Sequence, residues 1–133
     1  MADLAAIARA MYDAFGRGDI PGILQHLADD VAWESWADNQ AQKAGVPWMK
    51  ARRGKAGATE FFGVAGQLQI HDFKVLSIMA GGNQVAAEFT IEATVPSGKR
   101  YRDEEMHLWT FNEAGKVVRL RHYLDTAKHI AIA

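Results

Sequence analysis

Apolar residues recur every three or four positions between Leu4 and Phe15, which is the spacing of a helix with one buried face. Asp3 precedes this segment and can cap the helix. Asp19 and Pro21 begin a second, shorter helical pattern, because Asp is a favoured N-cap residue and Pro suits a first helical turn. The chain is therefore predicted to begin with two consecutive helices.

The pattern changes twice before residue 70. Residues 31–36, VAWESW, predict a strand. Residues 37–53 predict a long loop that holds Trp48, and loops of that length often carry function. A third helix is predicted over residues 57–68, although its glycines lower the helix propensity.

From residue 70 onward the pattern is that of strands. Four segments at residues 70–79, 84–95, 99–111 and 116–125 are separated by short turns that each contain glycine. Strands of similar length joined by such turns predict an antiparallel meander. Helices followed by a meander predict an α+β fold, in which three N-terminal helices pack on one face of a strongly curved antiparallel sheet.

Length and composition narrow the classes of function. A chain of 133 residues predicts one domain, residues 1–133. The 15 Lys and Arg residues nearly balance the 16 Asp and Glu residues, so no overall field attracts nucleic acid or an anionic membrane. The lack of cysteine excludes disulfides and thiol catalysis. Because Asp3, Arg9 and Asp13 interrupt the apolar start, it resembles neither a signal peptide nor a membrane span, and a cytoplasmic location is expected.

Three blocks of sequence resemble the nuclear-transport-factor-2-like (NTF2-like) superfamily, and in particular its SnoaL-like and ketosteroid isomerase-related domains. They are YDAFGRGD at residues 12–19, LADDVAW at residues 27–33, and FNEAGKVV followed by RHYLD within residues 111–125. The resemblance covers nearly the whole chain and implies a cone-shaped, cystatin-like fold that encloses one pocket for a small apolar or cyclic ligand. It does not imply one reaction, because a single fold hosts many chemistries.

The resemblance also assigns faces to the strands, since successive side chains of a strand alternate between its two faces. It places His107 at a pocket position on its strand and His122 at the position of a catalytic carboxylate on the last strand, with Glu105 at the rim. Counting back through the turn at residues 96–99 directs Glu88 inward. The residues predicted to line the pocket are Met11, Phe15, Trp33, Ser35, Phe62, Thr90, Trp109 and Leu120.

The same count directs Phe89, Ile91 and Val95 away from the pocket. A soluble monomer would rarely expose such an apolar stripe. The sequence therefore predicts a homodimer that packs through the convex faces of two sheets. Asp125, at the end of the last strand, is interpreted as closing a tail or a dimer contact.

The catalytic sets of the related enzymes are incomplete in this chain. Met11 and Ser35 occupy the positions where the ketosteroid isomerase pattern requires a tyrosine and a carboxylate base, and Tyr12 is one residue away. Glu88 and Thr90 occupy the positions where the epoxide hydrolase pattern requires an arginine and an aspartate. The cyclase pattern is the least altered of the three.

Two histidines and one carboxylate remain as candidate catalytic groups: His107, His122 and Glu88. A neutral histidine can take a proton from a carbon acid or a hydroxyl near pH 7, and a carboxylate can orient its ring. The first hypothesis is therefore a SnoaL-like enzyme that performs cofactor-independent acid–base chemistry, of isomerase or cyclase type, on a small cyclic or polyketide-like apolar molecule. The alternative is a ligand-binding or dimerising protein of the same fold that catalyses no reaction.

Other ligands fit the sequence less well. His107 and His122 with a carboxylate could hold a metal ion, but their spacing matches no metal-binding signature, so neither a metal nor another cofactor is expected. The basic run at residues 50–53 is short, and no nucleic-acid or membrane partner is expected. The remaining histidines are interpreted as surface or loop residues: His26, His71 and His129.

Overall fold

Two capped helices begin the chain, as the sequence predicts. In the computed structural model, which describes residues 3–133 but not the side chain of Ser35, α1 spans Leu4–Gly16 and α2 spans Ile20–Leu24. The carboxylate of Asp3 accepts a hydrogen bond from the backbone N–H of Ala6, and that of Asp19 accepts one from Gly22. Each bond satisfies a donor that the first helical turn leaves unpaired.

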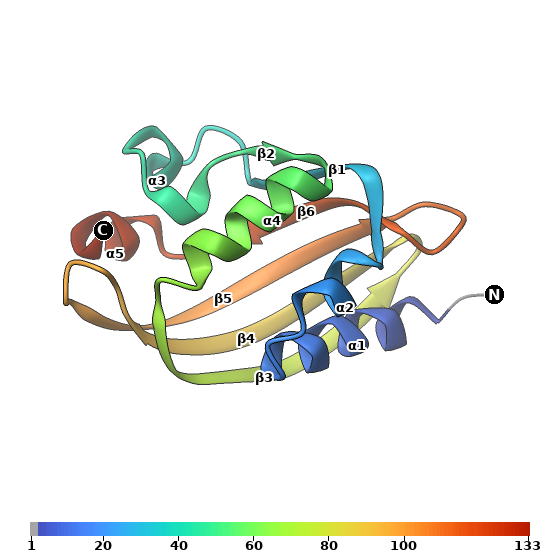
Figure 1. Cartoon of the computed structure of the whole chain (residues 1–133), viewed down its shortest axis with the longest axis horizontal. Helices are drawn as coiled ribbons and strands as arrows, with labels where there is room; N and C mark the ends of the chain where they lie inside the picture. Colours follow the sequence, from blue (N-terminus) through green and yellow to red (C-terminus); the bar gives the residue numbers. More distant parts are fainter. Residues whose placement is uncertain (1–2) are drawn as a thin grey trace.

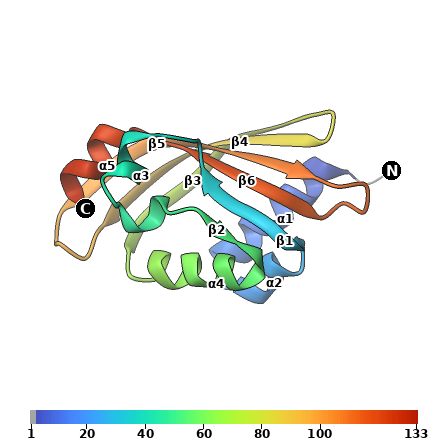
Figure 2. The same cartoon turned by 90° about the horizontal axis from the view of Figure 1, so that it is seen from above.

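Within the described part of the chain, six strands form one sheet in the order β2-β1-β6-β5-β4-β3. The strands are β1 Leu27–Ser35, β2 Arg52–Arg53, β3 Gln69–Gly81, β4 Gln84–Thr94, β5 Arg100–Phe111 and β6 Val117–Tyr123. The last four form the predicted antiparallel meander, whereas β1 joins β6 in parallel. Figures 1 and 2 show the sheet curving around α1, α2 and α4, which cover one face. The predicted α+β plan is confirmed.

The segment predicted as a long loop contains short regular elements. These are α3 at Gln40–Lys43, the 3₁₀ helix η1 at Pro47–Met49, and strand β2. Trp48 is only 7% exposed, so this segment packs into the domain through its aromatic residue. The third main helix, α4, follows at Gly54–Ala65, three residues earlier than predicted.

A fifth helix, α5 at Thr126–Ile132, follows the last strand and lies beside α3 at one end of the sheet (Figures 1 and 2). The sequence interpretation missed this helix. Asp125 caps it by accepting a hydrogen bond from the backbone N–H of Lys128, so within the chain this residue begins a helix. His129 is 1% exposed, and its interpretation as a surface or loop residue is wrong.

The predicted orientation of β4 is also wrong. The loop after β4 contains three residues, because the backbone N–H of Val95 pairs with the carbonyl oxygen of Lys99 and Gly98 adopts a φ of 88°. The sequence prediction treats Lys99 as part of the turn, which makes the turn one residue too long. A shift of one residue moves every side chain of a strand to the other face, so the predicted faces of β4 are reversed. Phe89 pairs with Glu105 and points inward, whereas Glu88 is exposed on the opposite face.

The apolar stripe of β4 therefore belongs to the interior. Phe89 is 1% exposed, Ile91 8% and Val95 3%, and all three lie in one of the two buried apolar clusters. This placement removes the stripe as an argument for a dimer, and the homodimer stays a prediction. No helix within residues 3–133 has both the length and the apolar character that crossing a membrane requires.

Candidate functional site

A cavity of about 90 Å³ lies between the sheet and the helices α1 and α4, and its walls are mainly aromatic. The structure brings the two candidate histidines, His107 and His122, together in its wall. Five of the residues predicted to line the pocket also lie there: Met11, Phe15, Trp33, Phe62 and Trp109. These residues come from the first, middle and last parts of the chain, because α1 and α4 cover the same face of the sheet (Figure 1).

The other predicted site residues lie elsewhere. Leu120 is buried in the apolar core and does not reach the cavity. Thr90 is 8% exposed, but it lies between two inward-facing residues of β4 and so points to the opposite face, as Glu88 does. Glu88 therefore cannot orient either histidine. The side chain of Ser35 lies outside the described part of the structure.

Tyr12 connects the first helix to the sheet through a directed chain of hydrogen bonds. The indole N–H of Trp109 donates to the Tyr12 oxygen over 3.0 Å, and the Tyr12 hydroxyl lies 2.7 Å from Nδ1 of His107. Burial raises the pKa of Tyr12 far above its usual value, so the phenol keeps its proton. Donation of this proton to Nδ1 satisfies both groups, because the Tyr12 oxygen already accepts from Trp109, and this arrangement places the hydrogen of the neutral His107 ring on Nε2.

His107 is a neutral hydrogen-bond donor rather than a base. Burial, reinforced by the nearby His122, lowers the pKa of His107 well below its usual value. Its Nε2–H makes no hydrogen bond to the described residues. A neutral imidazole N–H of this kind can polarise a carbonyl group.

His122 lies directly opposite His107 in the pairing of β5 with β6, and the two ring centres are 4.6 Å apart. Nε2 of His122 lies 2.7 Å from Oε1 of Glu105. Burial alone would raise the pKa of Glu105, but hydrogen bonds and charges of His122 and His129 outweigh it and hold this pKa well below its usual value. Since Glu105 is ionised, it accepts the proton of His122 Nε2, so Nδ1 is the ring nitrogen that carries the lone pair whenever His122 is neutral.

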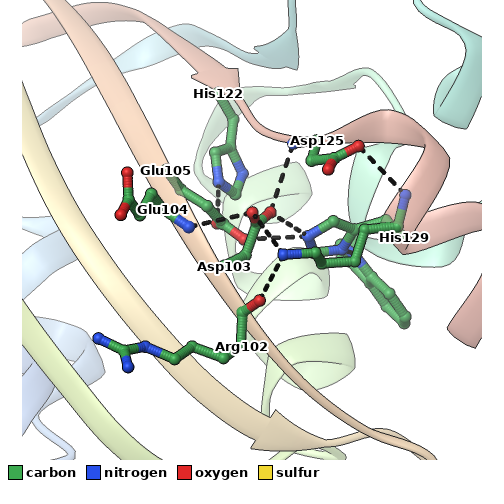
Figure 3. A network of polar contacts seen from close by, with 9 residues as sticks. Arg102, Asp103, Glu104, Glu105, His122, Asp125 and His129 are labelled. Atoms are coloured by element: carbon green, nitrogen blue, oxygen red, sulfur yellow. Dashed lines mark hydrogen bonds and ion pairs between the residues drawn. The ribbon is translucent and has the colours of Figure 1, made fainter.

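The second oxygen of Glu105 faces another histidine. Oε2 of Glu105 lies 3.0 Å from Nε2 of His129, and Oδ2 of Asp103 lies 2.9 Å from the same nitrogen (Figure 3). Lys128 lies 3.5 Å from Asp103, and the backbone N–H of Asp125 also donates to that carboxylate. The polar groups of β5 and α5 thus form one connected network beneath the cavity.

The tautomer of His129 follows from its contact with Trp48. The indole N–H of Trp48 donates to Nδ1 of His129 over 2.8 Å, and because an indole nitrogen is only a donor, Nδ1 must carry a lone pair. Burial opposes a second proton on the ring, but Asp103 and Glu105 outweigh burial and raise the pKa of His129 to about 9. A second proton, on Nδ1, would face the indole N–H of Trp48 at 2.8 Å, so the ring can take it only if this contact breaks; while the contact holds, the hydrogen of His129 is on Nε2.

The hydrogen bonds of His129 also decide whether a cation fits the cluster that this residue forms with two carboxylates. Asp103, Glu105 and His129 lie close enough together to surround an ion. A histidine binds a metal through a ring nitrogen that carries a lone pair, and its other ring nitrogen then donates its hydrogen. In His129 the nitrogen that faces the carboxylates holds the hydrogen, and the other faces a donor. The donor pattern is therefore that of a hydrogen-bond network rather than a metal site.

The sequence interpretation missed several residues of this site: Tyr12, Phe89, Ile91, Tyr101, Asp103 and His129. It also placed Glu105 at the rim, whereas that side chain is buried and bonds to His122. Strand periodicity could have identified four of the residues on β5, because every second side chain of a strand lies on the same face. These residues are Tyr101, Asp103, Glu105 and His107.

Comparisons with known proteins agree with the architecture. A family model described as a SnoaL-like domain matches residues 8–120. Among curated proteins, no sequence matches this chain. Similar solved structures include an NTF2-like protein of unknown function from Burkholderia pseudomallei, which is 23% identical with a TM-score of 0.82 and covers 99% of this chain and 98% of its own.

Two further structures show the same fold. TerC co-crystallised with polyporic acid is 24% identical, with a TM-score of 0.79 and coverage of 98% of both chains. A candidate polyketide cyclase from Pseudomonas putida is 22% identical, with a TM-score of 0.73, and covers 100% of this chain and 99% of its own. At these identities the likeness establishes the fold alone. Because the family match spans most of the sequence, the chain belongs to the SnoaL-like domain family.

Proposed function

We propose that this protein catalyses cofactor-independent proton transfer, of isomerase or cyclase type, on a small, cyclic, apolar molecule that carries an enolisable carbonyl group. One observation carries the proposal: His107 and His122 line the same largely apolar cavity with ring centres 4.6 Å apart, and their bonds to Tyr12 and Glu105 leave Nε2 of His107 and Nδ1 of His122 without a partner among the described residues. A hydrogen-bond donor beside a base is the pair that enolisation requires.

The proposed step moves one proton and one electron pair. Nδ1 of His122 removes a proton from the carbon next to the carbonyl group, and the electrons of that C–H bond form a C=C bond. The carbonyl π electrons move onto oxygen, where the Nε2–H of His107 stabilises the negative charge. Glu105 balances the positive charge that develops on His122. Return of the proton to another carbon, or attack of the enolate carbon on a second carbonyl, gives an isomer or a ring.

The lining of the cavity supports the substrate class. Its walls are aromatic side chains such as Trp33, Phe62 and Phe89, which favour a flat and uncharged ring system. TerC, a structural neighbour of this chain, was crystallised with polyporic acid, and another neighbour is described as a candidate polyketide cyclase. Both descriptions are consistent with a carbonyl-bearing cyclic molecule as the substrate of this chain.

Deuterium exchange tests this function without knowledge of the natural substrate. Cyclohexanone and 2-tetralone are incubated with the protein in D₂O, and loss of the α-proton signal is followed by ¹H NMR. We expect exchange above the buffer rate, and a reduction of about 10²- to 10⁴-fold in His122→Gln, the range that a general base typically contributes. His71→Gln is the matched control, because His71 is exposed on β3 and bonds to Thr94 outside the cavity. Wild-type exchange at the buffer rate, or full activity of His122→Gln, would contradict the proposal.

The second candidate is a binding protein that holds such a molecule without converting it. The connected hydrogen bonds from Trp109 to His107 and from His122 to Asp103 favour it, because they satisfy most polar atoms of the cavity before any ligand enters. Saturable binding of 2-tetralone, followed by quenching of tryptophan fluorescence, together with deuterium exchange at the buffer rate, is the outcome that selects this candidate.

A further inference from the structure

The C-terminal helix contributes a buried ionisable group that the proposed proton transfer does not use. His129 lies one turn after Asp125, the residue that caps α5, and this helix places the ring under the cavity at 1% exposure. The ring packs against Tyr101 of β5, with 4.9 Å between ring centres, and against Trp48 of η1. Three separate segments of the chain therefore hold this imidazole in place.

The hydrogen on Nε2 of His129 points at two carboxylates of β5. Asp103 is already held by other donors: Lys128, the backbone N–H of Asp125 and the backbone N–H of Glu104. Glu105 has no such support, since its side-chain hydrogen bonds are with the two histidines alone among the described residues. His129 thus determines where Oε2 of Glu105 lies, and with it the direction in which Oε1 points.

Oε1 of Glu105 is the atom that orients the proposed base, because it accepts the proton of His122 Nε2 over 2.7 Å. If the carboxylate rotated, this bond would weaken and the proton of neutral His122 could move to Nδ1, the nitrogen that must stay free to act as a base. The indole N–H of Trp48 acts one step earlier, because it keeps the hydrogen of His129 on the nitrogen that faces Glu105.

We propose that His129 is a positioning residue, which together with Trp48 fixes the Glu105 carboxylate so that neutral His122 carries its hydrogen on Nε2 and presents a free Nδ1 to the cavity. This inference rests on the proposed function for its catalytic meaning, but its structural content does not depend on any substrate. It makes η1 and α5 part of the functional site, although α5 lies at one end of the sheet (Figure 1).

The test reads the tautomer of His122 by two-bond ¹H–¹⁵N NMR across the titration. The groups facing His129 are Asp103, Glu105 and Tyr101 from β5, Lys128 from α5 and Trp48 from η1, and all are retained in the first pair of variants. His129→Leu removes the donor, whereas His129→Gln keeps an N–H donor at a similar reach. We expect neutral His122 to be the Nε2–H tautomer in wild type and in His129→Gln, and a mixture of both tautomers in His129→Leu.

A wild-type tautomer of His122 in a folded His129→Leu protein would overturn the proposal. If His129→Leu does not fold, as judged by circular dichroism, Trp48→Phe decides instead. That variant keeps an aromatic ring but removes the donor to Nδ1, so the hydrogen of His129 is no longer held on Nε2, and neutral His122 should show a mixture of both tautomers. A wild-type tautomer of His122 in folded Trp48→Phe would also overturn the proposal.

Deuterium exchange from 2-tetralone separates this inference from the proposed function. If both hold, His129→Leu lowers the exchange rate at least about tenfold and shifts its pH profile, and His129→Gln restores both, because an orienting group acts through the base it positions. If wild type shows no exchange while the tautomer of His122 still responds to His129→Leu, the proposed function fails and the positioning role stands. If wild type exchanges deuterium while the tautomer of His122 does not respond to His129→Leu, the proposed function stands and the positioning role fails.

Discussion

The hydroxyl of Tyr12 and Nδ1 of His107 lie 2.7 Å apart, although the two residues are 95 positions apart in the chain. This contact joins α1 to the centre of the sheet and fixes which nitrogen of His107 carries the hydrogen. Tyr12→Phe should destabilise the protein by about 1–3 kcal/mol, because it leaves the buried Nδ1 of His107 and the indole N–H of Trp109 without partners. Urea unfolding measures this loss. Tyr123→Phe, on the other face of the sheet, is the control, and an equal loss in both variants would argue against the contact.

The buried neutral His107 predicts the direction of the pH dependence of stability. The unfolded chain binds a proton at this histidine with a pKa near 6.5, whereas the folded protein does so only at lower pH. The free energy of unfolding should therefore be unaffected by His107 above pH 6.5 and fall on acidification below it, by up to about 1.4 kcal/mol per pH unit.

The variant His107→Asn isolates this contribution, because its amide oxygen can still accept the hydrogen bond of Tyr12 but does not titrate. Urea unfolding at several pH values between 5 and 8 should show a smaller loss of stability on acidification in the variant than in wild type. Glu105 adds a loss in the same direction only at lower pH, since its lowered pKa stabilises the folded protein above the usual carboxylate range. Parallel curves for the two proteins would show that His107 does not remain neutral on folding.

The sequence predicts the scaffold better than the site, for reasons that particular residues illustrate. Caps at Asp3 and Asp19 and the glycine turns of the meander are local signals, and they identify the first two helices and the order of the last four strands. The short α5 has too few residues to show a helical period. The contacts of Tyr12 with His107 and of Trp48 with His129 join residues more than 80 positions apart, and no local pattern reports them.

The face of β4 shows how one uncertain residue changes a predicted site. Assigning Lys99 to the turn directs Glu88 into the pocket, whereas the pairing of Val95 with Lys99 directs Phe89 there. Burial supplies an independent criterion for the orientation of β4. Every second residue of this strand is apolar, and the face of a sheet that helices cover must be apolar, so the apolar residues should point toward the helices. That criterion favours the observed face and would have assigned the orienting carboxylate to Glu105 instead.

A pair of neighbouring substitutions tests this register. Phe89→Ala should lower the free energy of unfolding by about 3–5 kcal/mol, because it opens a hole in the buried cluster. Glu88→Ala, one residue away, should change it by less than about 0.5 kcal/mol, because that side chain is exposed and makes no ion pair among the described residues. Urea unfolding of the two variants measures both effects, and a larger loss in Glu88→Ala would restore the orientation predicted from the sequence.

The size of the cavity makes a prediction about substrate choice. A groove of about 690 Å³ adjoins the cavity, and side chains that include Phe15, Phe62 and Phe73 line both spaces. At about 90 Å³ the cavity is small even for a single ring, given that an apolar cavity of about 150 Å³ accommodates benzene. A two-ring molecule must therefore displace one of these side chains. Phe73 is the better candidate, because it comes from β3 at the edge of the sheet and is only half-buried.

Phe73→Ala should consequently favour the larger of two ketones. Its ring packs on Phe89 with 4.9 Å between centres and on Phe15 with 5.3 Å, so its removal joins the cavity to the groove without touching His107 or His122. The rate of deuterium exchange from 2-tetralone should rise relative to that from cyclohexanone, measured as a ratio in the same sample so that any loss of folded protein cancels. Phe61→Ala provides the control, because Phe61 lines the cavity but not the groove. An unchanged ratio in Phe73→Ala would place the entrance elsewhere.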